Sequence, residues 1–148
     1  SKRGAINPLI LQLASGMARK EGGELHIIHV WHLFGERYVR SSGMTAEAVQ
    51  EAKVLEKMQH KQRFDTLLNR AAVTDLNPHL HLIEGNPGDR IPELVVEQGI
   101  DLLVMGTVCR TGIAGFLIGN TAEEVLNQVD CSVLTIKPEG FVTPVPLE

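Results

Sequence analysis

The chain has 148 residues, 43% of them hydrophobic and 22% charged, with a formal net charge of −4. These values predict one globular domain over 1–148 with an ordinary apolar core. No run of Lys and Arg and no apolar stretch of about 18 residues stands out, so neither nucleic acid nor a membrane is expected as a partner. The two cysteines, Cys109 and Cys131, lack disulfide or metal-type spacing, which favours a reduced, cytoplasmic setting.

The chain is expected to open with a helix. Asn7-Pro8 is typical of a helix start, and Gly22-Gly23 is typical of its end. Between them, apolar residues recur at helical spacing: Leu9, Leu13 and Met17. Leu25 to Trp31 then has the composition of a strand, and Trp31 and Phe34 are expected to cap the core rather than to stack on a base.

A long helix is expected over Ala46 to Ala72, with Thr45 as its N-cap. Its predicted apolar stripe consists of Ala48, Ala52, Leu55, Met58, Phe64, Leu67, Leu68 and Ala71. Its charged residues are expected on a solvated outer face: Glu47, Glu51, Lys53, Glu56, Lys57 and Lys61. After Asn77-Pro78, the alternating residues from His79 to Glu84 predict a short strand.

The second half of the chain alternates in the same way. A helix is expected from about Asp89 to Gln98, where Pro92 is acceptable only in the first turn. Leu102 to Met105 is a continuous apolar run, typical of a strand buried on both faces. A helix over roughly Asn120 to Val129 and a strand over Ser132 to Ile136 follow. This alternation predicts an α/β domain with a parallel sheet, right-handed crossovers and helices on both faces.

The glycine-rich stretch after the Leu102 strand is the candidate binding site. The strand ends at Gly106, where the missing side chain lets a ligand approach the backbone. Gly119 opens a helix whose first residues are Asn120 and Thr121, and the free N–H groups of such a first turn form an anion site. Arg110 is the only cation of this stretch and can pair with the same phosphate. The structural alternative is an ordinary strand–glycine–helix joint with Asn120 as a helix cap.

The same stretch resembles the signature of the universal stress protein family: a glycine, two residues, a glycine, nine residues, a glycine and a small polar residue. Gly106 and Gly119-Asn120 take the first and last places, whereas Cys109 stands at the middle glycine. The resemblance extends upstream to Gly85-Asn86-Pro87 and downstream to Lys137-Pro138. The tail beyond is similar to the second half of the family's E-type tandem members, so the chain resembles one half of a tandem protein.

The resemblance implies a doubly wound open parallel sheet with strand order 3-2-1-4-5. In the nucleotide-binding branch of the family it also implies a site for ATP or another adenine nucleotide, with Mg²⁺. Adenine and ribose would lie near Val30 and Gly106-Thr107. The triphosphate would lie against Cys109-Arg110 and Gly119-Asn120-Thr121. A side chain at Cys109 crowds the approach of a ligand to the backbone.

Members of that family begin with a central strand that ends in an acidic residue at the nucleotide site. Here the first helix starts almost at once, and Ser1 to Ile6 is too short and too polar to form that strand. Omission of the middle strand leaves unpaired edges inside the core, which is costly. We therefore expect the first strand to be absent from this chain, or to be supplied by another chain.

Histidines and a cysteine offer further chemistry. His79 and His81 share one face of a predicted strand, and His26 lies on the strand expected beside it. No carboxylate or thiol has metal-motif spacing with them, so a solvated polar face is favoured over a zinc site and no metal is predicted. Cys109 beside Arg110 has the setting of a redox thiol. A replacement for glycine is favoured, because no resolving cysteine is evident.

We expect a stress-response module that binds an adenine nucleotide and acts through dimer or tandem association. It is not expected to be an enzyme, since no nucleophile, base and orienting group can be recognised. The last strand carries the apolar Val133 and Ile136 at the sheet edge, and related proteins pair such strands with a second domain of the same family. One alternative is an interaction domain with a decayed site or an apolar ligand near Met105, Ile113 and Phe116. A weak ATPase is the other.

Overall fold

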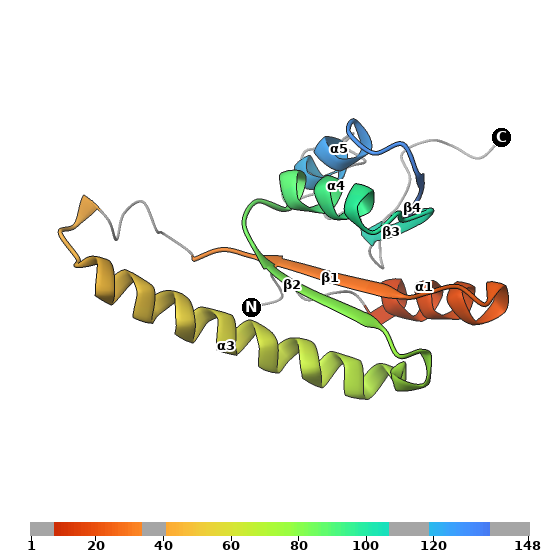
Figure 1. The fold of residues 1–148 in the computed structure, drawn as a ribbon, viewed down its shortest axis with the longest axis horizontal. Coiled ribbons are helices and arrows are strands. Elements are labelled where there is room, and N and C mark those ends of the chain that lie inside the picture. Colours follow the sequence, from red (N-terminus) through yellow and green to blue (C-terminus); the bar gives the residue numbers. More distant parts are fainter. Residues whose placement is uncertain (1–7, 34–40, 107–118, 137–148) are drawn as a thin grey trace, which may run out of the picture. The chain divides into compact units, whose positions relative to one another are not determined.

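The computed structural model describes residues 8–33, 41–106 and 119–136 (Figure 1). The chain divides into two compact units, Ser1–Asn86 and Pro87–Glu148, and each is described by itself. The single domain expected from length therefore stays a prediction. No helix of the described residues is both long and apolar enough to cross a membrane.

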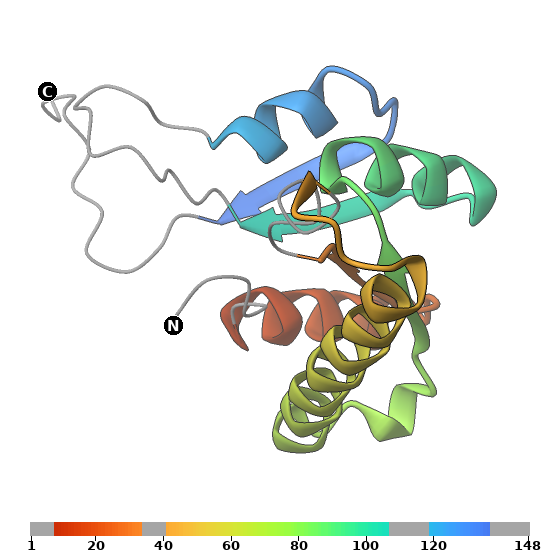
Figure 2. The ribbon, with the colours of Figure 1, turned by 90° about the vertical axis from the view of Figure 1, so that its left-hand side faces the viewer.

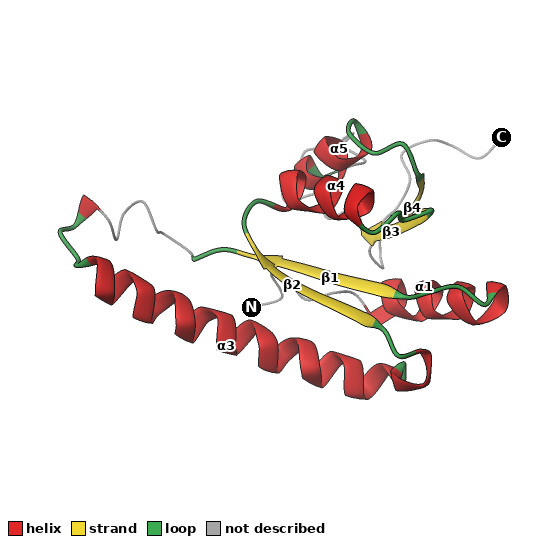
Figure 3. Cartoon of the chain, in the orientation of Figure 1, coloured by secondary structure: helices red, strands yellow, loops and turns green. Residues whose placement is uncertain are grey.

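The described part of the first unit consists mainly of helices, a short 3-10 helix and a pair of strands (Figure 3). In chain order these are α1 (Pro8–Glu21), β1 (His26–Trp31), α3 (Ala46–Ala71), η1 (Thr74–Leu76) and β2 (His79–Glu84). β1 and β2 run parallel, with His26 opposite His79. Thr45 caps α3 as predicted, because its hydroxyl oxygen accepts a hydrogen bond from the N–H of Ala48 at 3.1 Å.

The core of the first unit lies between α1, β1 and α3. Its buried residues come from all three elements and the segments beside them: Leu11, Leu25, Ile27, Phe64, Leu68 and Val73. Along β1, Ile27 and Trp31 are buried, whereas His26 and Ile28 are half-buried. Because alternate residues of a strand point to opposite faces, the face with Ile27 packs on the core and the face with His26 points away from it.

The apolar stripe predicted along α1 does not lie in this core. Leu9, Leu13 and Met17 are all more than one-third exposed, and Leu11 and Ser15 are the buried residues of the helix. All three exposed residues line a cleft of about 1280 Å³ between α1 and α3. Helical spacing in the sequence cannot distinguish a cleft from a core.

The stripe predicted along α3 is right at its end and wrong in its middle. Phe64 and Leu68 are buried, but Leu55 and Met58 are 62% and 53% exposed. Lys53 and Glu56, expected on the outer face, are half-buried instead. Lys53 Nζ lies 2.8 Å from a carboxylate oxygen of Glu84, and Glu56 pairs with His60, so these charges are satisfied on the inner face.

The second unit has the same alternation of helix and strand. Its elements are α4 (Pro87–Glu97), β3 (Leu102–Gly106), α5 (Asn120–Leu126) and β4 (Ser132–Ile136). β3 and β4 run parallel, with Gly106 opposite Ile136. Both helices lie on the same side of this strand pair, as Figures 1 and 2 show. The expectation that β3 is buried on both faces is therefore wrong: Leu102 is 39% exposed and the rest of the strand is half-buried.

Pro92 lies inside α4, not in its first turn as expected, because the helix already begins at Pro87. A proline has no N–H for the carbonyl four residues earlier, which is that of Gly88. The side-chain Nε2 of Gln128 donates to this carbonyl at 3.0 Å. A side chain from beyond α5 thus supplies the hydrogen bond that the proline cannot make, and the helix continues through it.

The α/β class with parallel strands is confirmed by both strand pairs. β1 with β2, and β3 with β4, match the neighbours 2 and 3, and 4 and 5, in the strand order 3-2-1-4-5. Within the described residues no strand precedes α1. Residues 1–7 lie outside them, so the origin of a first central strand stays a prediction.

Candidate functional site

The part of the predicted site that the structure describes lies at the carboxyl ends of β3 and β4. β3 ends at Gly106, and Gly119 directly precedes α5 with an extended backbone, at φ −71° and ψ 159°. The first turn of α5 lies on the same side of the unit as the ends of both strands (Figure 2). This is the edge at which open α/β sheets bind ligands.

The start of α5 presents polar groups to solvent. Gly119 is buried, whereas Asn120 and Thr121 are exposed. Ala122 and Val125 on the opposite side of the helix are buried and hold it in place. Gly119 is the N-cap, so the structural alternative in which Asn120 caps the helix is wrong. Asn120 and Thr121 are therefore free of a capping role and can donate hydrogen bonds to an anion.

One charge at this edge works against an anionic ligand. Glu123 is exposed and lies in the first turn of α5, where a carboxylate interacts with the positive end of the helix. It would repel a phosphate at the same turn. A divalent cation or a neighbouring basic side chain would be needed to offset it.

The remaining residues of the predicted site are placed elsewhere or not described. Thr107, Cys109 and Arg110 lie outside the described residues, so their roles stay predictions. Val30 is a half-buried residue of β1, in the first unit. In the second unit the end of β3 at Gly106 and the start of α5 after Gly119 lie on the same side (Figure 2).

A chain of polar contacts that the sequence did not reveal connects β1 with α3. His29 Nε2 lies 2.9 Å from His60 Nδ1, and His60 Nε2 lies 3.2 Å from Glu56 Oε1. Burial lowers the pKa of His29, and electrostatic interaction with His60 and Arg63 lowers it further. His29, His60 and Arg63 line the cleft between α1 and α3. The only local signal was the spacing of Glu56 and His60, four residues apart on a helix.

The model of the universal stress protein family matches residues 8–137, and this chain belongs to that family. Within the family it is similar to the E type. Universal stress protein E of Escherichia coli strain K12 is 43% identical over 68 residues, which are 46% of this chain and 22% of that protein. The match thus covers less than a quarter of the curated relative.

Solved structures agree on the fold. The structure of a hypothetical protein, MJ0577, has a TM-score of 0.72 and 19% identity, with 95% of this chain and 94% of that chain covered. A functionally unknown protein from Pseudomonas aeruginosa PAO1 has a TM-score of 0.63 and 29% identity, with 86% and 39% covered. A universal stress protein from Archaeoglobus fulgidus in complex with dAMP has a TM-score of 0.57 and 19% identity, with 93% and 90% covered.

Proposed function

We propose that this chain is a stress-response ligand module that binds an adenine nucleotide, with ATP as the leading candidate. The observation that carries the proposal is the joint in the second unit. Gly106 ends β3, Gly119 precedes α5, and Asn120 and Thr121 stand exposed at the helix start. Two backbone sites without side chains and two hydrogen-bond donors at one strand edge suit a phosphate group.

Family membership supports the nucleotide as the ligand class. The family relative from Archaeoglobus fulgidus was solved with dAMP, an adenine nucleotide. The dAMP ligand belongs to that protein. Because the two chains are only 19% identical, their similarity shows the fold alone. The joint at Gly106 and Gly119 is the feature of this chain that makes the same ligand class plausible here.

Mg²⁺ fits the donors available at this edge. The described residues offer the amide oxygen of Asn120, the hydroxyl of Thr121 and the carboxylate of Glu123, and Mg²⁺ binds through oxygen ligands. When bound with the nucleotide, the ion would neutralise phosphate charge. It would also offset the repulsion between Glu123 and a phosphate, which is the one unfavourable charge that the structure shows there.

We further propose that the module acts by association with a second universal-stress-protein domain and not as an enzyme. In the described residues β4 pairs with β3 alone, and Val133 on β4 is half-buried. A strand at the edge of a sheet can pair with a strand of another domain. The 39% coverage of the Pseudomonas aeruginosa chain leaves room in that relative for a further domain. The cytoplasm is the proposed setting, because the two cysteines lack a disulfide pattern.

Calorimetric titration of the chain with ATP at millimolar Mg²⁺ tests the nucleotide proposal. We expect saturable binding to one site per chain. Asn120→Ala is expected to weaken binding by about tenfold to a hundredfold, the value of a hydrogen bond to a charged group. Asn127→Ala is the matched control, because Asn127 is an exposed asparagine at the other end of the same helix.

Three outcomes distinguish the competing functions. Absence of both heat and a thermal shift at millimolar ATP would refute nucleotide binding and leave an interaction domain. Gain of affinity in Cys109→Gly would show that the side chain at the middle glycine position had weakened the site. Release of phosphate above a blank without protein would identify a weak ATPase and refute the non-enzymatic proposal.

A further inference from the structure

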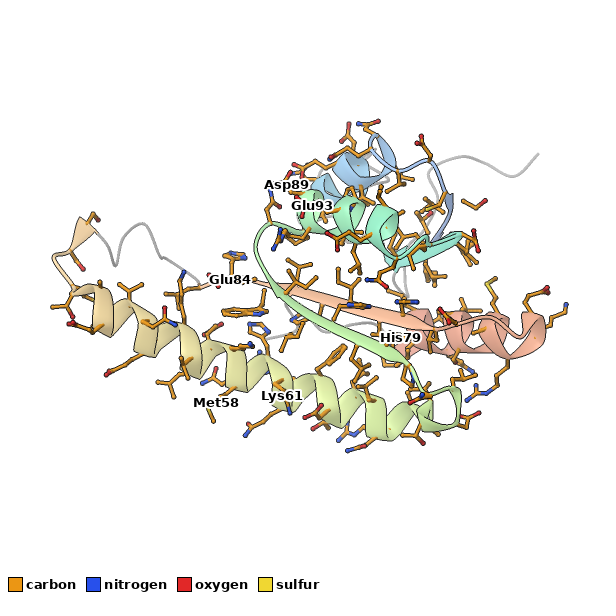
Figure 4. All side chains as sticks on the ribbon, viewed as in Figure 1. Met58, Lys61, His79, Glu84, Asp89 and Glu93 are labelled. Atoms are coloured by element: carbon orange, nitrogen blue, oxygen red, sulfur yellow. The ribbon has the colours of Figure 1, made fainter. Side chains whose placement is uncertain are left out.

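Three histidines and a glutamate gather where β1 and β2 begin, in the first unit. His26 and His79 stand opposite each other in the parallel register. The side chain of His81, two residues along β2, shares the face of His79. Glu24 lies just before β1. Figure 4 labels His79 at the start of β2.

The backbone holds this arrangement rigidly. The N–H of His79 donates to the carbonyl of Leu25 at 2.9 Å, which extends the pairing of the two strands by one hydrogen bond before β1 begins. Leu25 itself is 5% exposed and belongs to the core. The segment from Glu24 to His26 is thus tied to the start of β2 on one side and to the core on the other, so the fold sets the backbone positions from which the side chains extend.

The distances between the polar atoms suit a single metal ion. Glu24 Oε2 lies 3.5 Å from His26 Nε2 and 4.0 Å from His79 Nε2. One ligand atom from each of the three residues lies within 4.8 Å of the others. In tetrahedral zinc coordination, bonds of about 2.0–2.2 Å place neighbouring ligand atoms about 3.4 Å apart. The rings of His26 and His79 are stacked, with centroids 4.4 Å apart and 12° between their planes. Because an imidazole binds a metal in the plane of its ring, the His79 side chain, which is 52% exposed, would have to rotate out of this stack to share an ion with His26 and Glu24.

We propose that Glu24, His26 and His79 bind a divalent metal ion of the zinc class. Two imidazoles and one carboxylate form a ligand set that binds borderline-soft ions such as Zn²⁺ in preference to Mg²⁺ or Ca²⁺. With neutral imidazoles the set carries one negative charge, which suits a divalent cation. In the described residues the carboxylate of Glu24 contacts His26 and His79, and no lysine or arginine of that part of the chain forms a salt bridge with it.

His81 acts in this site as a positioning residue. Its Nε2 lies 3.1 Å from Nδ1 of His26, and the two rings are nearly parallel, with centroids 5.4 Å apart. When Nε2 of His26 binds the ion, its Nδ1–H donates to His81. Such a hydrogen bond sets the tautomer and orientation of a metal-binding histidine and strengthens it as a ligand.

The site is open on one side. The side chain of His26 is 10% exposed, whereas those of His79 and Glu24 are 52% and 79% exposed. Three protein ligands leave a fourth tetrahedral position, and that position faces solvent at His79 and Glu24. A water molecule or a donor from another molecule would complete the coordination.

Titration of the tag-free chain with ZnCl₂ in a calorimeter tests the proposal. We expect one ion per chain. Glu24→Gln and His79→Gln are expected to lose most of the affinity, and His81→Gln is expected to weaken it by about tenfold to a hundredfold. Glu21→Gln and His32→Gln are the matched controls, because both residues are exposed and lie close to the site in sequence without belonging to it. Circular dichroism confirms that each variant is folded.

Titration with Co²⁺ gives a second readout that reports the ligands directly. The expected visible spectrum is that of nitrogen and oxygen coordination, without a thiolate charge-transfer band. Binding of Zn²⁺ by Glu24→Gln and His79→Gln with unchanged affinity would overturn the proposal. So would a thiolate band, since it would place the ion on a cysteine. Neither readout involves a nucleotide, so the result is independent of the proposed ATP site.

Discussion

Nε2 of His29 on β1 lies 2.9 Å from Nδ1 of His60 on α3, with both rings half-buried. Burial and electrostatic interaction with His60 and Arg63 lower the pKa of His29 below its ordinary value of 6.5. The folded state therefore holds His29 neutral at a pH at which the unfolded chain already binds a proton. Half-buried His29 thus links the stability of the first unit to pH.

We predict that the unfolding free energy falls as the pH decreases from 6.5 through the lowered pKa of His29. The sign follows because the unfolded chain binds more protons in this window, and the slope for one group reaches at most about 1.4 kcal/mol per pH unit. Urea unfolding at several pH values measures it. His29→Gln should flatten the profile, whereas His32→Gln should retain it. Equal slopes in the wild type and His29→Gln would contradict the assignment.

Because Gln128 donates a hydrogen bond to the carbonyl of Gly88, we predict that the contribution of Gln128 to the unfolding free energy depends on Pro92. Gln128→Ala should cost about 1 kcal/mol of unfolding free energy, the usual net value of one hydrogen bond. In a Pro92→Ala background residue 92 regains its N–H and can donate to Gly88 itself, so the same change should cost less. A double-mutant cycle in urea measures the difference. Additive effects would show that Gln128 does not substitute for the missing N–H.

Trp31 is 4% exposed, and in the described part of the chain its indole N–H is buried without a hydrogen-bond partner. We predict that Trp31→Phe changes stability by less than about 1 kcal/mol, because loss of volume is offset by removal of an unsatisfied donor. Trp31→Ala should cost about 3–5 kcal/mol. Unfolding followed by circular dichroism measures both. Tryptophan fluorescence cannot be used, because both variants remove the only tryptophan of the chain. Similar losses in the two variants would show that the N–H has a partner.

The elements of the fold were predictable because their signals are local. Thr45 caps α3 as expected, and the strand limits follow from alternation and from glycine. The inner face of α3 was not predictable. By sequence alone Lys53 is expected in solvent, and its salt bridge to Glu84 depends on where β2 lies relative to α3. The same limit applies to Pro92. The hydrogen bond that its missing N–H cannot make to Gly88 comes from Gln128, which is distant in the sequence.

The two candidate sites differ in the same way. Gly106 and Gly119 could be recognised because a glycine at a strand end and another before a helix are readable in one short stretch. Glu24 was missed because it has no motif spacing with His79. The two come together only through the parallel register of β1 and β2, which places His26 opposite His79.

The most direct test of the proposed function is a titration of the ¹⁵N-labelled chain with ATP and Mg²⁺, followed by amide NMR shifts. The account predicts saturable shifts that are largest at Gly106, Gly119, Asn120 and Thr121. The affinity for ATP obtained from these shifts should fall in Asn120→Ala but not in Asn127→Ala. Shifts confined to the cleft between α1 and α3, or no shifts at millimolar ATP, would contradict a nucleotide site at the start of α5.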